Sequence, residues 1–560
     1  MMRRVVPFDP ARVLFEDDDL LVVDKPAFVP SQATEEGAHD DLVARLRALL
    51  MGRGADPYLG VHQRLDAGTS GVILFVRRKS ANGAIARQFE GRTVGKVYLA
   101  AVTLRAKLPE VLRDHLVVKD GTSRVVPKGT RGAQLAVTKT RVLERVGDRA
   151  LVRLELETGR MHQARAQLAH HGAPIAGDPL YGGAPASRLM LHAHELEVAH
   201  PTSGRSTTFR APAPADLADW VRRGELGDAV YGDPAALSAS LAAALERRYG
   251  LATSEETTAF RLVNEAGDAL PGVAIDVYGE HAVVQIYGTD GPLGDEAARE
   301  RLLDAVAALG FAGVYLKVRP KQANVVVDAA ARGLTPPEAV RGANAADPLV
   351  IREEGVPLWV RLGDGLSTGL FLDQRRNRRL VRSLARGARV ANLFAYTSAF
   401  SVFAALGGAR STVSVDASAG VLVRGKENLT LAMPDHDPDA HAFVCEDVFA
   451  WTRRQKPGSF DLVVLDPPSY ATTKKTRFVA DSDYGDLAAR AIRMLAPGGR
   501  LLACTNHRKI GLPRFRHTLL GAVRAEKRPL AQLKDLPEPV DYPYPIGGAC
   551  HLKAVLVTLG

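Results

Sequence analysis

From about residue 357 onward, short apolar runs alternate with segments of helical character, and this alternation constrains the fold more than any other feature of the sequence. The apolar runs cover residues 389–394, 412–416 and 460–466. Strands separated by helices form a doubly wound parallel sheet, which binds ligands at the carboxyl ends of its strands. Asn392, Asp416 and Asp466 fall at such ends. We therefore expect residues 353–560 to form a Rossmann-like α/β domain with a ligand site at that edge.

The preceding residues divide into a strand-rich part and a smaller mixed part. Residues 1–222 contain several short apolar runs bounded by turn residues, which predicts an α+β domain built on a mixed sheet. Residues 223–256 are rich in Ala and Leu and predict a helical linker, packed on either neighbour. Residues 257–352 combine strand-like runs with an amphipathic helix over 294–309, as in a small α+β module. A chain of 560 residues is too long for one core, which agrees with this multidomain division.

Composition restricts the partners and the compartment. The net charge of +10 and the pI near 9.5 favour a polyanionic partner such as nucleic acid. Cys445, Cys504 and Cys550 are too few and too scattered for a zinc site or a disulfide framework, which indicates a reducing cytoplasm. We expect neither a signal peptide nor a membrane-spanning helix, because no long apolar run follows the first residues. The sequence leaves the oligomeric state open.

The most specific motif of the first part runs from Arg64 through Leu65, Asp66 and Ala67 to Gly71. It resembles the core signature of RluA-type pseudouridine synthases. The resemblance spans roughly residues 12–222, and its further blocks are residues 96–100, 158–165 and 174–182. An extra Gln63 between His62 and Arg64 departs from the family pattern and leaves the role of His62 open.

This resemblance implies isomerisation of uridine in RNA without a cofactor. The reaction breaks a carbon–nitrogen bond and rejoins the uracil through carbon, so an ionised carboxylate has to reach the sugar or the base, and Asp66 is the candidate. Arg165 would compensate the charge of Asp66. The target base has to leave the helical stack. By the family pattern, Arg64 fills the vacated space, and Tyr98 stacks on the uracil or moves a proton.

The histidines of this part need a separate interpretation. By number they suggest a metal cluster, and they are His162, His170, His171, His192 and His194. Only His192 and His194 share a strand face, and no acidic residue stands at ligand spacing in the sequence. We therefore predict structural or RNA-facing histidines and no metal site.

In the last part, the first strand end lacks the glycine pattern of dinucleotide-binding folds, which argues against a pyrophosphate ligand. Asp416 ends the following strand, where its carboxylate can accept both ribose hydroxyls of a nucleoside. Asp447 follows a further strand and is placed to meet an adenine amino group. This arrangement fits S-adenosylmethionine, which has ribose and adenine but no phosphate.

Residues 257–558 resemble large-subunit ribosomal RNA methyltransferases of the RlmK and RlmI type. The blocks that carry the resemblance are residues 366–375, 392–397, 407–411 and 466–470. In that family Pro467 and Pro468 stiffen a loop, so that Asp466 and backbone carbonyls face the target base. The residues that the resemblance and the strand order place at the donor site are Asp373, Gln374, Asn392, Phe394, Tyr396, Asp416, Asp447 and Asp466.

The methylated atom depends on whether a cysteine attacks the base. Carbon 5 of cytosine normally needs a thiolate to add to the ring first, whereas N7 of guanine has a free lone pair and needs only positioning. Asn506 stands where the cytosine-type members have their cysteine, and Cys504 lies two positions earlier. We predict transfer to guanine N7 and interpret Cys504 as a small buried hydrophobic residue.

The sequence thus predicts a bifunctional RNA-modifying enzyme that acts on 23S ribosomal RNA or on precursor ribosomal particles. Three alternatives stay open: cytosine C5 as the methylated atom, transfer RNA as the substrate of the first part, and an inert RNA-binding assembly factor. A DNA methyltransferase fused to an RNA-binding domain is disfavoured by the strand order and the small module.

Overall fold

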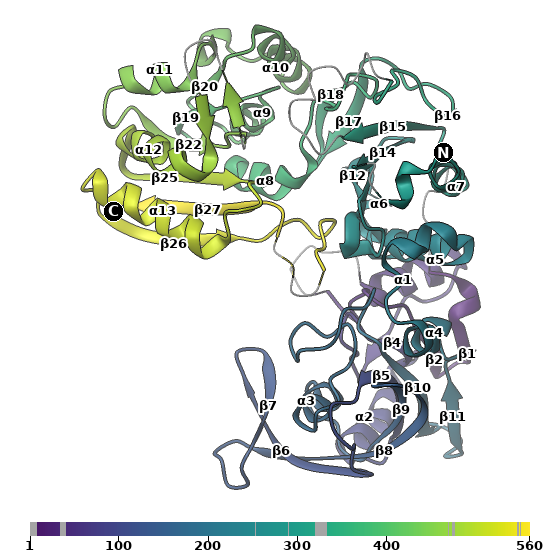
Figure 1. Ribbon diagram of the computed structural model, residues 1–560. Helices are drawn as coiled ribbons and strands as arrows, with labels where there is room; N and C mark the ends of the chain where they lie inside the picture. Colours follow the sequence, from purple (N-terminus) through teal and green to yellow (C-terminus); the bar gives the residue numbers. More distant parts are fainter. Residues whose placement is uncertain are drawn as a thin grey trace.

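The computed structural model describes residues 8–33, 41–252, 254–288, 291–319, 333–468, 470–472, 477–545, 548 and 550–560. Residues 1–7, where we expect no signal sequence, lie outside this part of the chain. The described residues form a lower lobe from the first part of the sequence and an upper lobe from the rest (Figure 1). None of the described helices is long and apolar enough to cross a membrane.

The lower lobe is built on an 11-stranded sheet with the order β1-β2-β4-β10-β5-β9-β8-β6-β7, to which β3 and β11 add at β4 and β10. Its strands are β1 (Val13–Glu16), β2 (Leu20–Lys25), β3 (Gly60–Val61), β4 (Ser70–Val76), β5 (Gly95–Thr103), β6 (Val111–Lys119), β7 (Thr122–Val126), β8 (Gln134–Val146), β9 (Arg149–Leu156), β10 (Leu191–Ala199) and β11 (Ser206–Arg210). Only β4 and β10 pair in parallel, so the mixed sheet predicted from the sequence is confirmed.

Four α-helices accompany this sheet, namely α1 (Leu42–Gly52), α2 (Asn82–Glu90), α3 (Gln163–His170) and α4 (Ala215–Arg223). Strand β4 is buried along its whole length, because side chains of α1 and α2 pack in the same core. A strand buried on both faces reads as a continuous apolar run, which is why β4 was recognisable in the sequence.

The small module is a five-stranded sheet with the order β12-β13-β14-β15-β16. Its elements are β12 (Ala259–Asn264), β13 (Val273–Tyr278), β14 (His281–Tyr287), β15 (Gly313–Arg319), β16 (Arg341–Gly342), α5 (Pro234–Arg247), α6 (Tyr249–Ala252) and α7 (Glu296–Ala307). Leu237, Leu241 and Ala244 of α5 belong to the core of this module. The segment expected to be a linker therefore packs on the module that follows it.

The upper lobe contains a seven-stranded sheet with the order β21-β20-β19-β22-β25-β27-β26. The strands are β19 (Arg389–Leu393), β20 (Ser411–Asp416), β21 (His441–Cys445), β22 (Phe460–Leu465), β25 (Leu495–Thr505), β26 (Leu530–Leu536) and β27 (Lys553–Leu559). All pairs from β21 to β25 are parallel, and β27 is antiparallel to both of its neighbours. The order of the strands reverses between β19 and β22, which is where doubly wound sheets bind ligands.

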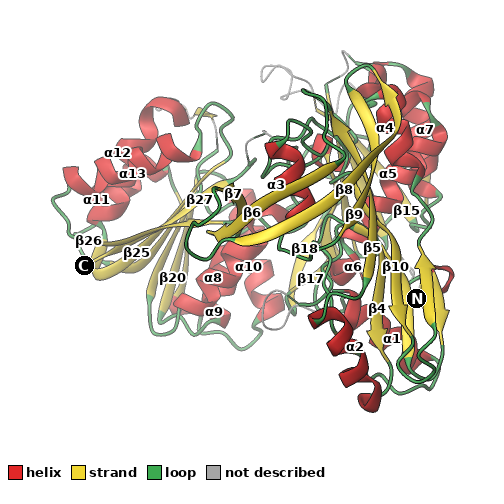
Figure 2. Ribbon diagram, turned by 90° about the horizontal axis from the view of Figure 1, so that it is seen from below, coloured by secondary structure: helices red, strands yellow, loops and turns green. Residues whose placement is uncertain are grey.

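Helices cover both faces of this sheet, as the predicted fold class requires. They are α8 (Arg375–Leu384), α9 (Ala399–Leu406), α10 (Ala419–Ala432), α11 (Val448–Arg454), α12 (Ala480–Arg493) and α13 (Leu512–Ala525). Figure 2 shows α11, α12 and α13 on one face and α8, α9 and α10 on the other. Two short hairpins complete the lobe, β17 (Leu349–Glu353) with β18 (Val356–Val360), and β23 (Tyr470–Thr472) with β24 (Arg477–Val479).

The small module and the seven-stranded sheet of the upper lobe are joined by a shared apolar core and by a hydrogen bond to a buried carboxylate. Side chains of β12–β15 pack with those of β17, β18 and α9 in one apolar cluster. Asp541 is fully buried, accepts a hydrogen bond from the backbone N–H of Arg261 (2.9 Å) and pairs with Arg375. Arg378 pairs with buried Glu353 through two hydrogen bonds of 2.6 Å. Breaking one partner of a buried pair costs about 3–5 kcal/mol, so these two pairs fix α8 to the β17–β18 hairpin and to the segment that carries Asp541, whose other contact is Arg261 of the small module.

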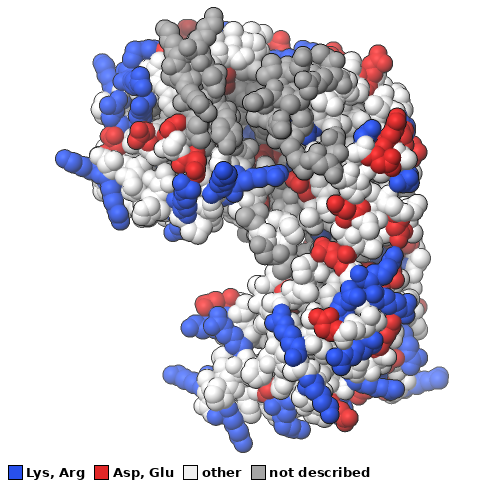
Figure 3. Space-filling model, in the orientation of Figure 1, with Lys and Arg blue, Asp and Glu red and all other residues white. Residues whose placement is uncertain are grey.

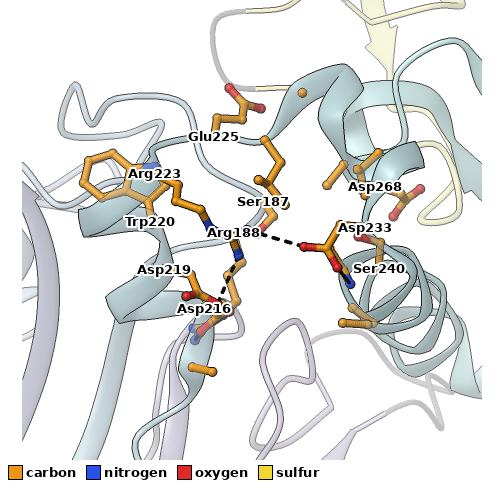
Figure 4. A pocket seen from close by; sticks show the side chains of 18 of the residues that line it. Ser187, Arg188, Asp216, Asp219, Trp220, Arg223, Glu225, Asp233, Ser240 and Asp268 are labelled. Carbon is orange, nitrogen blue, oxygen red and sulfur yellow. Dashed lines mark hydrogen bonds and ion pairs between the residues drawn. The ribbon is translucent and has the colours of Figure 1, made fainter. Parts of the chain in front are cut away.

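A cavity of about 420 Å³ separates α5 from the lower lobe (Figure 4). Arg188 on the lower-lobe side pairs with Asp216 at 2.6 and 2.8 Å, and Arg223 reaches Asp233 at 3.4 Å. At the same junction the guanidinium of Arg247 lies 3.6 Å from the centre of the Phe28 ring. The lower lobe thus contacts the small module through ion pairs and a cation–π contact around a cavity, and not through a continuous apolar core.

Candidate active sites

The loop between β3 and β4 carries Asp66 and is held from below by a buried lysine. Lys25, at the end of β2, donates hydrogen bonds to the carbonyls of Pro26, Val29 and Ala67 at 2.9, 2.7 and 3.1 Å. Burial lowers the pKa of Lys25 to about 7, although the charge of Asp66 opposes this shift. Because the third bond is made to the residue after Asp66, Lys25 fixes the backbone that presents the carboxylate.

Arg165 of α3 joins two carboxylates. Its NH1 donates to Oδ2 of Asp66 at 2.8 Å, while Nε and NH2 donate to the two oxygens of buried Asp178 at 2.7 and 2.9 Å. Burial alone would lower the pKa of Arg165, but Asp178 and Asp66 outweigh it and hold the pKa above its ordinary value. The predicted pair of Asp66 and Arg165 is therefore present, and Asp178 sets the orientation of the guanidinium.

Two further residues complete the surroundings of Asp66. Nε2 of His162 lies 3.6 Å from Oδ2 of Asp66, and its Nδ1 lies 3.1 Å from the hydroxyl of Tyr181. Burial lowers the pKa of His162. His162, Tyr181 and Asp178 were not predicted from the sequence to belong to this site, although they stand within the motif blocks 158–165 and 174–182.

Tyr98 and Arg64, the other two residues predicted for this site, have different surroundings. Tyr98 lies on β5, and burial together with the charge of Asp66 raises the pKa of its hydroxyl. Arg64 is exposed, as a side chain that enters an RNA stack has to be. His62 instead makes a hydrogen bond with Oδ1 of Asn82 at 2.7 Å.

The histidines require one correction. We expected no acidic neighbour for them, but Asp114 on β6 lies 3.1 Å from Nε2 of His171, and with His170 these residues form a group whose ligand atoms lie within 4.8 Å of one another. The pairing of β6 with the end of α3 is a long-range contact that sequence spacing does not reveal. Asp114 already accepts a hydrogen bond from Gln167 (2.7 Å), and His192 contacts Ser70 (3.0 Å).

In the upper lobe, the loop from β19 to α9 holds an unusual backbone conformation. Phe394, Tyr396 and Ser398 all have positive φ values, 59°, 51° and 57°. Such conformations are uncommon for residues other than glycine and concentrate at ligand sites. Below this loop, the side-chain amide of Asn392 donates to buried Ser401 at 3.1 Å, so Asn392 supports the loop from within the sheet.

The two acidic residues expected to hold a nucleoside stand at neighbouring strand ends. Asp416 ends β20 and accepts hydrogen bonds from the backbone N–H groups of Tyr396 and Ser418, both at 2.9 Å. Asp447 follows β21 and caps α11 through the N–H of Ala450 at 3.0 Å. Each carboxylate oxygen can accept a second hydrogen bond, so these contacts orient Asp416 and leave acceptor capacity for ribose hydroxyls.

Asp466, after β22, belongs to a buried polar cluster. It accepts a hydrogen bond from Nε2 of Gln374 at 2.8 Å, while Oε1 of Gln374 accepts one from Asn377 at 2.6 Å. Burial, and next the charge of Asp373, raises the pKa of Asp466 to about 7. Burial also raises the pKa of Asp373. Because the negative charge of Asp373 raises the pKa of Asp466, a cation bound beside Asp466 would be favoured, which fits the sulfonium of S-adenosylmethionine.

Cys504 and Asn506 occupy different environments at the end of β25. Cys504 is fully buried, and its Sγ lies 3.8 Å from Oε1 of Gln374. Burial, and next the charge of Asp466, raises the pKa of its thiol well above the ordinary value. Asn506 is exposed just beyond the strand. Of the loop 466–470, Ser469 lies outside the described residues, as do residues 473–476.

Comparisons with known proteins find a match for each of the two lobes. The family model for RNA pseudouridylate synthase matches residues 19–170, and the model for S-adenosylmethionine-dependent methyltransferase matches residues 323–558. A ribosomal RNA large subunit methyltransferase from Deinococcus radiodurans is 34% identical over 336 residues, which cover 58% of this chain and 80% of that protein. The ribosomal RNA large subunit methyltransferase I from Aeromonas salmonicida is 33% identical over 321 residues, 56% of this chain and 78% of that protein.

A crystal structure of a methyltransferase complexed with SAH is also similar, with 28% identity, coverage of 58% of this chain and 81% of that chain, and a TM-score of 0.51. The fold and the two sites define a bifunctional RNA-modifying enzyme with one catalytic domain in each lobe. The chain belongs to the S-adenosylmethionine-dependent methyltransferase family of these relatives, and an RNA pseudouridylate synthase domain precedes the methyltransferase in the same chain. Its methyl donor is S-adenosylmethionine.

Proposed function

We propose that this chain isomerises a uridine of 23S ribosomal RNA in its lower lobe and methylates guanine N7 of the same class of RNA in its upper lobe, in the cytoplasm. The synthase assignment rests mainly on the Asp66–Arg165–Asp178 arrangement, in which a buried guanidinium is hydrogen-bonded to both carboxylates. The ribosomal substrate is supported by the relatives, which are large-subunit ribosomal RNA methyltransferases by name.

In the lower lobe, the ionised Asp66 attacks the flipped nucleotide or removes a proton from it. Arg165 donates a hydrogen bond to this carboxylate and orients it, and Tyr98 contacts the uracil. Because Tyr98 keeps its proton at neutral pH, it can donate a hydrogen bond to the base or pass on a proton during the rearrangement.

In the upper lobe, the surroundings of Cys504 support attack by a lone pair of the base. A thiol whose pKa is raised and whose sulfur faces Gln374 is a poor nucleophile. Asp466 and the backbone after it then hold the base, and Asn506 is available to contact it. Bound S-adenosylmethionine supplies the methyl group, and the enzyme has only to align it with N7.

Nucleoside mass spectrometry of ribosomal and transfer RNA from cells with and without the gene tests this function. We expect one pseudouridine and one 7-methylguanosine to disappear from 23S RNA in the deletion strain. Loss of pseudouridine from transfer RNA alone would assign the lower lobe to that substrate. Unchanged modification in both RNA classes would favour an RNA-binding assembly factor.

The role of Asp416 at the donor can be measured directly. Calorimetry should show that Asp416→Ala weakens S-adenosylmethionine binding about tenfold or more, because losing an acceptor for a buried ligand costs about 1–3 kcal/mol. Asp439→Ala, which removes an exposed carboxylate of the same domain, serves as the matched control and should bind normally. Equal affinities for the two variants would remove Asp416 from the donor site.

Cys504→Ser separates the two methylation mechanisms. A thiolate mechanism would lose nearly all of its rate, because a serine hydroxyl is far less nucleophilic at neutral pH. We expect most of the activity to remain, with a small loss of stability from polar substitution in the core. Digested product RNA should contain 7-methylguanosine. An inactive serine variant, together with 5-methylcytidine in the wild-type product, would instead establish the cytosine reaction.

A further inference from the structure

Two basic surfaces face each other across the hollow between the lobes. Figure 3 shows this hollow on the left of the molecule, with Lys and Arg side chains on both of its rims. In Figure 1, β26 and α13 lie above the β6–β7 hairpin, on the opposite side of the hollow, and in the view from below in Figure 2 they lie to the left of the hairpin. The lower rim belongs to the synthase lobe and the upper rim to the methyltransferase lobe.

The lower rim is the segment 111–134, which contains β6 and β7. It carries five exposed Lys and Arg residues against two acidic ones, and none of the five makes an ion pair within the described part of the chain; they are Arg113, Lys119, Arg124, Lys128 and Arg131. The hairpin is joined to the synthase site, because the backbone N–H of Ser123 donates to the hydroxyl of Tyr181 (2.9 Å), which in turn contacts His162. RNA lying on this rim is therefore close to Asp66.

The upper rim is the segment 508–534, which runs from the end of β25 through α13 into β26. It contains eight Lys and Arg residues and a single acidic one, Glu526. Some of these cations are neutralised within the lobe, since Arg514 pairs with Asp481 (2.9 Å) and Arg516 with Asp535 (2.6 Å). Four exposed cations have no ion pair among the described residues, namely Lys509, Arg524, Lys527 and Lys534.

The nine cations named above have no ion pair among the described residues that would neutralise them, and Figure 3 shows Lys and Arg side chains on both sides of the hollow. Like charges that face each other across water repel, so the two rims destabilise each other when nothing lies between them. A polyanion bound in the hollow would remove this repulsion. A phosphate backbone neutralises both surfaces and releases its counterions, which is the main source of affinity for RNA.

We infer that the upper rim, although it belongs to the methyltransferase lobe, binds the RNA that the synthase lobe modifies, so that one RNA molecule is held between both rims. This inference rests on the proposed function, because it takes RNA as the substrate of the lower lobe. It assigns to residues 508–534 a role in the isomerisation of uridine, a reaction whose chemical groups all lie in the other lobe.

The decisive experiment measures isomerisation after changing only the methyltransferase lobe. In the full chain, Lys509, Arg524, Lys527 and Lys534 are replaced together by Gln, and pseudouridine formation is followed on a 23S RNA transcript. We expect KM to rise at least about tenfold with little change in kcat, because these cations would hold phosphates and not the reacting base. The slope of log affinity against log salt, from filter binding of the same transcript, should fall by about one unit per lost contact.

A matched variant controls for net charge. Arg386, Arg410, Arg453 and Lys456 are exposed near the amino ends of the parallel strands of the same lobe, and their replacement by Gln removes the same charge. We expect this variant to isomerise uridine with the wild-type KM. S-adenosylmethionine binding should be unchanged in both variants, which shows that the lobe is folded.

The outcomes separate the inference from the function. A rim variant that isomerises with the wild-type KM and salt slope overturns the shared binding of one RNA, while the synthase function stands. A rim variant that loses only methyl-transfer activity, with isomerisation unchanged, also overturns the shared binding of one RNA and leaves the synthase function standing. A wild-type enzyme that forms no pseudouridine in this transcript contradicts the proposed substrate, and a rim variant whose salt slope for that RNA is nevertheless reduced still supports the binding surface.

Discussion

Replacing Asp66 by Asn should abolish pseudouridine formation, with a loss of at least about a thousandfold in rate, and leave methyl transfer largely intact. The amide is nearly the same size but carries no anion, so it can neither attack the nucleotide nor remove a proton from it. Arg165 keeps its two bonds to Asp178, and the site should therefore stay folded. Tritium release from labelled uridine RNA and methyl incorporation, measured on the same preparation, give both rates.

Asp56→Asn provides the matched control for this variant. Asp56 is exposed on the approach to β3 and accepts a hydrogen bond only from the backbone of Tyr58. Both activities should be normal in this control. If Asp66→Asn protein isomerised uridine at the wild-type rate, another carboxylate would have to supply the anion, and Asp66 would lose its assignment.

Asp466→Asn should lower the rate of methyl transfer about a hundredfold, while pseudouridine formation continues. Removing one preorganised polar group at a reacting centre commonly costs a hundred- to a thousandfold in rate. In the wild type the side-chain amide of Gln374 donates a hydrogen bond to Asp466. An asparagine that presents its NH2 group at this position would be a second donor and could not accept this bond. Asp461→Asn, at the opposite end of the same strand, breaks an exposed pair with Arg389 and should have almost no effect.

The raised pKa of Asp466 adds a dependence on pH. Its carboxyl has a pKa of about 7, so it is ionised above that pH and protonated below it. If the anion is the active form, methyl transfer in the wild type should decline as the pH falls through about 7. The Asn variant lacks this group, and its residual rate should not follow the same titration. Parallel pH profiles for the two proteins would show that another group controls the reaction.

The sequence predicted the elements whose contacts are local. The apolar runs of β4, β19 and β22 and the turn residues after them are contiguous in the chain, so periodicity was sufficient to place them. The pairing of Asp66 with Arg165 was predicted from the charge requirement of the chemistry, and the structure contains it.

Contacts between distant segments were not predictable in the same way. Lys25 looks like an ordinary polar residue in the sequence, and only folding brings it beneath the loop that carries Asp66. Asp114 became a neighbour of His171 because β6 crosses the end of α3. The affiliation of α5 was left open because its composition suits either partner, and only its buried face decides that it packs on the small module.

The packing of α5 has a consequence for the history of such a chain. The core that contains Leu237 and Leu241 continues into β12–β15, and Arg248, directly after α5, forms a buried ion pair with Asp268 of the same module. A recombination point inside this region would leave apolar surface and a buried charge without partners. The boundary at which an ancestral synthase could be joined to a methyltransferase therefore lies ahead of α5, near residue 225, where the described residues of the two halves meet through ion pairs and a cation–π contact around a cavity.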